Sequence, residues 1–94
     1  MTDEELLLIP GGELIIQGLS DVKNGLTTEY SLMLQIAAAN LNLKGIAVKQ
    51  EEITMQNLPE HKMYEILLAN HSRSEAYSRY SSMMRRLAKF CSCI

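Results

Sequence analysis

The segment at residues 30–41 most constrains the fold, because it is apolar on nearly every side of a helix. Ser31, Gln35 and the following Asn42 form one thin polar stripe at helical spacing. A helix that is hydrophobic nearly all round must be buried nearly all round. In a chain of 94 residues few helices can lie so centrally. We therefore predict a buried central helix at about 28–42, with the other elements packed around it.

The composition also favours helices over strands. Hydrophobic residues make up 47% of the chain and charged residues 21%, which is typical of a folded protein and argues against disorder. The chain has no Trp, one Phe and six Met. Leucine, isoleucine, alanine and methionine must therefore fill the core, and these residues suit helix packing better than a sheet.

Capping and breaking residues divide the chain into further helices. Thr2 and Glu5 match a capping box, and the short helix that they begin must end before Pro10. Gly25 ends the next helix in a left-handed conformation. Pro59 lies in the first turn of a later helix. The segment at 44–57 fits either a short helix or an irregular loop.

The last helix is predicted at about 73–90. Its apolar positions lie on one side at helical spacing: 76, 77, 80, 83, 84, 87, 90 and 91. No linker separates two parts of the chain. We expect an all-α fold, a compact bundle of four or five helices that forms one domain over residues 1–94.

The apolar edge of this last helix is the first candidate site. Tyr77, Tyr80, Met84 and Leu87 follow the three-four spacing of a helix-pairing seam for about two heptads. A small Leu- and Met-rich chain has more apolar surface than one short core can hide. We expect a small cytoplasmic, non-enzymatic interaction or regulatory module that pairs with itself as a homodimer, or with another protein, through these four residues. A plain monomeric core is the structural alternative.

The distribution of charge suggests a second candidate. Residues 1–70 hold ten acidic residues and four lysines, whereas residues 71–94 hold five basic residues and one acidic residue. On the polar side of the last helix lie Arg79, Arg85, Arg86 and Lys89. Such a basic surface can contact phosphates, so the alternative function is a nucleic-acid-binding regulator. The net charge of −2 counts against it.

Catalytic and cofactor motifs are missing from the sequence, so we expect neither an enzyme nor a bound cofactor or metal. Cys91 and Cys93 are two thiols where zinc needs four ligands. Their Cys-Ser-Cys-Ile context fits a prenylation box only poorly, and we interpret Cys91 as a packed thiol.

No apolar stretch approaches the ~20 residues of a membrane span. The acidic N-terminus is unlike a signal peptide, which together with the thiols favours the cytoplasm.

Overall fold

Six helices form the part of the chain that the computed structural model describes, residues 2–48 and 58–94. They are α1 (Asp3–Leu7), α2 (Gly12–Lys23), α3 (Glu29–Ile36), α4 (Ala38–Leu43), α5 (Pro59–Asn70) and α6 (Arg73–Cys93). These residues include no strand, and the fold measures 34 × 26 × 23 Å along its principal axes. The predicted all-α fold is confirmed.

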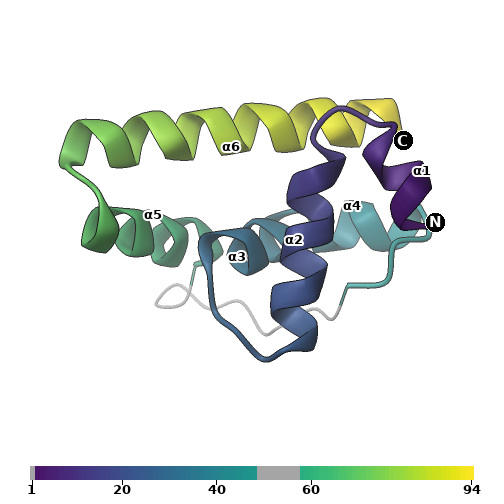
Figure 1. Ribbon diagram of the computed structural model, residues 1–94, viewed down its shortest axis with the longest axis horizontal. Helices are drawn as coiled ribbons and strands as arrows, with labels where there is room; N and C mark the ends of the chain where they lie inside the picture. Colours follow the sequence, from purple (N-terminus) through teal and green to yellow (C-terminus); the bar gives the residue numbers. More distant parts are fainter. Residues whose placement is uncertain (1, 49–57) are drawn as a thin grey trace.

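The helices are arranged around α3 (Figure 1). This helix contacts α2, α5 and α6. The long α6 runs along one side of the molecule, where it follows α5 after a tight turn and lies antiparallel beside it. Helix α1 lies against α2, near the end of the molecule where α6 finishes. One long face of α6 therefore packs inward, and the rest of its circumference remains available for other contacts.

The buried apolar side chains form one cluster to which all six helices contribute. Its members are Leu6, Leu14, Ile15, Leu32, Met33, Leu34, Ala38, Leu41, Ile46, Val48, Met63, Leu67, Ala76, Met83, Leu87 and Phe90. Aliphatic residues and methionine dominate this list, as the composition predicted. Phe90 is the one aromatic side chain among them, and it is fully buried.

Side-chain caps begin three of the helices, and the cap at Thr2 is the predicted one. The hydroxyl oxygens of Thr2, Thr28 and Ser72 each accept the backbone N–H three residues further on, at 3.2, 3.2 and 3.3 Å. Such bonds satisfy amides that have no partner within a helix. Gly25, with φ of 71°, follows the end of α2 as predicted. These local signals set the helix boundaries.

The central helix differs from the prediction, because it is broken at Ala37. Its φ of −103° and ψ of 9° interrupt the predicted 28–42 helix, so that α3 ends at Ile36 and α4 begins at Ala38. This division accounts for a sixth helix where four or five were expected. Alanine has the highest helix propensity of all residues, so local preference does not explain the break. The helix propensity of Ala37 therefore gives no warning of the break.

Two glycines bring α2 close to its neighbours. A Cβ atom on Gly18 would lie 2.7 Å from Cγ of Leu34 and 2.8 Å from the carbonyl oxygen of Tyr30, so only glycine allows α2 to cross α3 at this distance. Gly11 has φ of 85°, and a Cβ atom there would lie 2.8 Å from the carbonyl oxygen of Arg86. The start of α2 therefore lies directly against α6.

A buried carboxylate joins α2 to the start of α3. Asp21 is only 5% exposed. Its two oxygens accept hydrogen bonds from the Thr28 hydroxyl at 2.6 Å and from the Gln17 amide at 2.9 Å. A buried polar side chain is tolerated when it is hydrogen-bonded in this way. Asp21 thus sets the angle at which the chain turns from α2 into α3.

The segment after α4 is irregular as far as it is described. The Asn42 side chain donates to the Val48 carbonyl at 2.9 Å and accepts from the Val48 amide at 2.8 Å. This pair of bonds holds Ile46 and Val48 in the core. Residues 44–48 therefore agree with the irregular loop, one of the two alternatives left open for 44–57, and residues 49–57 lie outside the described residues.

Candidate functional site

Helix α6 divides into a buried side and several exposed sides. Ala76, Met83, Leu87 and Phe90 are buried, and they mark the side that faces the core. At 100° per residue, Tyr77, Tyr80 and Met84 flank this side on one edge, and Arg79 and Arg86 flank it on the other. The two predicted groups of site residues therefore lie on different sides of one helix.

The first exposed side is an aromatic surface between α5 and α6. Tyr77 is 65% exposed. Tyr80 is partly buried, and its ring lies 5.8 Å from that of Tyr64 at an angle of 81°, an edge-to-face arrangement. Met84 is partly buried one turn further along α6. We call Tyr64, Tyr77, Tyr80 and Met84 the tyrosine face.

A shallow hollow of about 660 Å³ opens beside Tyr77. It is lined by Tyr64, Ser72, Arg73, Ser74 and Tyr77. Two aromatic rings thus meet the cationic Arg73 at the start of α6, so the hollow can receive an apolar or aromatic group.

Leu87, the fourth residue of the predicted interface, lies elsewhere. It is 5% exposed and belongs to the core of its own chain. Leu87 follows Met84 at helical spacing, but the rotation of α6 turns Leu87 toward the core. Only Tyr77, Tyr80 and Met84 of the predicted four are therefore accessible to a partner.

The environment of Tyr80 keeps its hydroxyl neutral. Burial raises the pKa of this phenol above its ordinary value, and the Glu60 carboxylate raises it further. Both effects disfavour the phenolate. The raised pKa extends the range over which Tyr80 stays uncharged, and an uncharged aromatic side chain suits packing against another surface.

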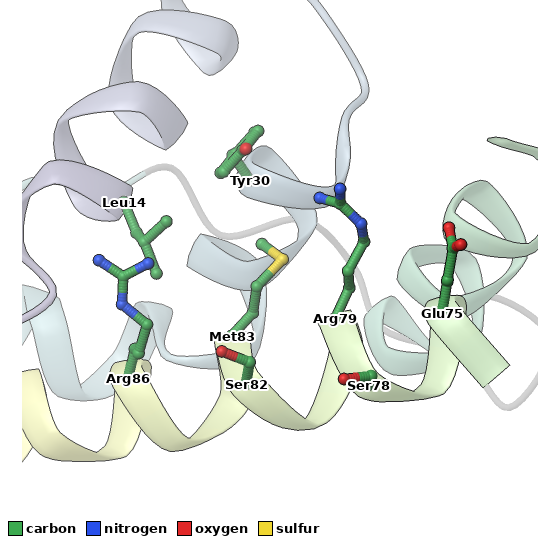
Figure 2. A pocket seen from close by; sticks show the side chains of 8 residues that line it. All are labelled: Leu14, Tyr30, Glu75, Ser78, Arg79, Ser82, Met83 and Arg86. Carbon is green, nitrogen blue, oxygen red and sulfur yellow. The ribbon is translucent and has the colours of Figure 1, made fainter. Parts of the chain in front are cut away.

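The four predicted basic residues are all exposed, but the structure separates them into two pairs. Arg79 and Arg86 line a cleft between α6 and the α2–α3 pair, whereas Arg85 and Lys89 are not among its lining residues. Figure 2 shows the guanidinium groups of Arg79 and Arg86 pointing from α6 toward the side where Leu14 and Tyr30 lie. The basic surface is therefore not one continuous stripe.

We call the cleft lined by Arg79 and Arg86 the α6 cleft. Its volume is about 420 Å³, and its lining residues are Leu14, Tyr30, Glu75, Ser78, Arg79, Ser82, Met83 and Arg86. Arg86 forms an ion pair with Glu13 at the start of α2, and both side chains are about half exposed. No ion pair joins Arg79 to any residue that the structure describes. Glu75 lies 3.7 Å from Nδ1 of His71.

The two cysteines lie in different environments. Cys91 packs against the core, as predicted. Burial raises the pKa of its thiol, and a hydrogen bond with Asn40 offsets this only in part. Cys93 is exposed. Within residues 2–48 and 58–94, no group of three or more His, Cys, Asp or Glu side chains could hold a metal ion.

Sequence reasoning missed Tyr64, Glu13 and Tyr30 as parts of these surfaces. Tyr64 comes directly after the buried Met63, so helical spacing could have placed it at the edge of the core. The seven-residue separation of Arg79 and Arg86 could likewise have placed both on one side of α6. Nothing in the sequence indicates that Glu13 or Tyr30 lies opposite them, because those contacts join distant segments.

In comparisons with family models, with curated proteins and with solved structures, the chain gave no significant match. None of the described helices is long and apolar enough to cross a membrane.

Proposed function

We propose that this chain is a small non-enzymatic interaction module that forms a homodimer through the tyrosine face. One observation carries the proposal: Tyr77 is 65% exposed beside a hollow that Tyr64 and Tyr77 themselves line. Tyrosine and methionine are enriched at protein interfaces, and tyrosine is frequent among the residues that dominate binding. A partner that covers Tyr77 would bury a large aromatic side chain that is now 65% exposed.

A second copy of the chain is the occupant that fits this surface. A two-fold axis brings the same surface of both copies together, so the surface must complement itself. The tyrosine face meets this need, because a protruding ring at Tyr77 lies next to a hollow that can receive the partner's ring. Arg73 at the rim can rest on an aromatic face in a cation–π contact. The two free thiols of the chain, Cys91 and Cys93, suit a reducing compartment, so we place the module in the cytoplasm.

Light scattering during size-exclusion chromatography tests the proposal. The wild-type protein should have twice the monomer mass of 10.6 kDa. Tyr77→Asp should give a monomer, because it puts a charge into the interface. Leu8→Asp is the matched control, since Leu8 is 86% exposed and lies at the end of α1, outside the tyrosine face. A monomeric wild type, or a control that dissociates as readily as Tyr77→Asp, would contradict the proposal.

The alternative, nucleic-acid binding, rests on the four exposed basic side chains of α6. One observation opposes it: the basic surface is not continuous, because Arg79 and Arg86 line the α6 cleft whereas Arg85 and Lys89 do not. Fluorescence anisotropy with a labelled oligonucleotide measures it directly. Binding that weakens with salt and that Arg85→Gln with Lys89→Gln reduces would favour this alternative over the dimer module.

A further inference from the structure

The α6 cleft has the size and the mixed lining of a site for a small molecule. Its volume of about 420 Å³ falls within the range of roughly 300–1,000 Å³ that is usual for ligand sites. Leu14, Met83 and the Tyr30 ring offer apolar contacts, whereas Ser78 and Ser82 offer hydroxyl groups. Such sites combine an apolar lining with a few polar groups that orient the ligand.

Ser82 lies between the two arginines of the cleft along α6. Arg79 precedes Ser82 by three residues, and Arg86 follows it by four. Residues at these spacings are neighbours on a helix surface. Both guanidinium groups point to the same side of α6 (Figure 2). An oxyanion beside Ser82 is therefore within reach of two arginine forks, which match phosphate and carboxylate geometry.

Two carboxylates decide what kind of anion fits. Glu13 pairs with Arg86, but this pair is about half exposed, and such pairs contribute little to stability. An incoming anion can therefore replace the Glu13 carboxylate. Glu75 lines the other end of the cleft and repels a second negative group there. The site thus favours one anionic head on a neutral, apolar body over a polyanion.

From this arrangement we infer that the α6 cleft binds a phosphate monoester with a flat apolar body. The phosphate lies by Ser82 between Arg79 and Arg86, and the body packs on Tyr30, Leu14 and Met83. This site lies on the opposite edge of α6 from the tyrosine face. It is independent of the homodimer, and a protein that fails to dimerise still binds the ligand.

Phenyl phosphate is a suitable probe, and two-dimensional amide NMR of the full chain measures even weak binding. A saturable titration should shift the amides around Tyr30, Ser78 and Ser82. Arg79→Gln should weaken binding by about tenfold or more, because a charge-assisted hydrogen bond is lost. Arg85→Gln is the matched control, an exposed arginine on the same helix outside the cleft, and should change binding by no more than about twofold. The spectra also show whether each variant is folded.

The Glu13–Arg86 pair allows a test in which two substitutions should change the affinity for the probe in opposite directions. Arg86→Gln should weaken binding, whereas Glu13→Gln should tighten it, because a competing carboxylate is removed. A merely structural ion pair would make both substitutions act in the same direction. Inorganic phosphate and benzyl alcohol, the head and the body alone, should each bind more weakly than phenyl phosphate. No saturation at about 10 mM probe, or equal losses in Arg79→Gln and Arg85→Gln, would overturn the inference.

Discussion

Helices α3 and α6 use their residues in opposite ways. Five of the eight residues of α3 are buried, including the polar Ser31 and Gln35. Only four of the 21 residues of α6 are buried. The difference follows from position, because α3 lies between α2, α5 and α6, whereas α6 lies along one side of the molecule. The central helix α3 contributes mainly to the core, and the peripheral helix α6 supplies the two surfaces on which function is proposed.

The largest effect should come from truncating the buried side of α3. Leu34→Ala removes a side chain that is 0% exposed, and we expect it to lower the free energy of unfolding by about 2–5 kcal/mol. Urea denaturation measures the change. The matched control is Leu43→Ala, since Leu43 is 85% exposed and should cost less than about 0.5 kcal/mol. Similar losses in both variants would contradict the assigned burial.

Gly18→Ala tests whether tertiary contact overrides local preference at the α2–α3 crossing. Helix propensity alone predicts stabilisation by about 1 kcal/mol. Contact with Leu34 and the Tyr30 carbonyl predicts the opposite, a loss of about 1–3 kcal/mol from overpacking. Thermal unfolding gives the sign. Ser20→Ala, on the exposed side of the same helix, is the control and should change stability little. A more stable Gly18→Ala protein would show that α2 and α3 do not approach so closely.

The Glu13–Arg86 pair should contribute much less to stability. Because both side chains are about half exposed, a double-mutant cycle with Glu13→Gln and Arg86→Gln should give a coupling of about 0.2–1 kcal/mol. The coupling should shrink as salt is added. A large, salt-independent coupling would mean that the pair is shielded from water, and α6 would then resemble α3 more than we describe.

The smallest effect, one of reactivity alone, should separate the two thiols of α6. Burial raises the pKa of Cys91, so at a given pH less of it is thiolate, the form that reacts. The Cys93→Ser protein, which keeps Cys91, should therefore react with an aromatic disulfide reagent more slowly than the Cys91→Ser protein. Its rate should rise at a higher pH when folded than when unfolded in urea. In urea both proteins should react at the same rate. A fast reaction of Cys91 in the folded protein would contradict its packing against the core.

Much of the secondary structure was predictable because its signals are local. A capping hydroxyl at Thr2, Thr28 or Ser72 bonds an amide only three residues away, and Pro59 restricts its own backbone. The apolar periodicity of the last helix correctly predicted that Ala76, Met83 and Phe90 lie inside. The burial of Asp21 was missed, although its spacing from Leu14 and Gly18 places it on the same side of α2.

The sites were less predictable, because their members come from different helices. Periodicity assigns a residue to one side of a helix, but it does not say what lies opposite. Tyr77 and Leu87 both fit the apolar spacing, yet one is 65% exposed and the other 5%. Arg79 and Arg85 are equally basic, yet only Arg79 lines the cleft.

The sequence by itself determined the helical class, most helix boundaries and the polarity of each helix side, since propensity, capping and periodicity act over a few residues. Only the tertiary structure decided the break at Ala37, the pairing of Glu13 with Arg86 and the division of α6 into a tyrosine face and a cleft. These features depend on contacts between residues far apart in the chain, and no short-range pattern encodes such contacts.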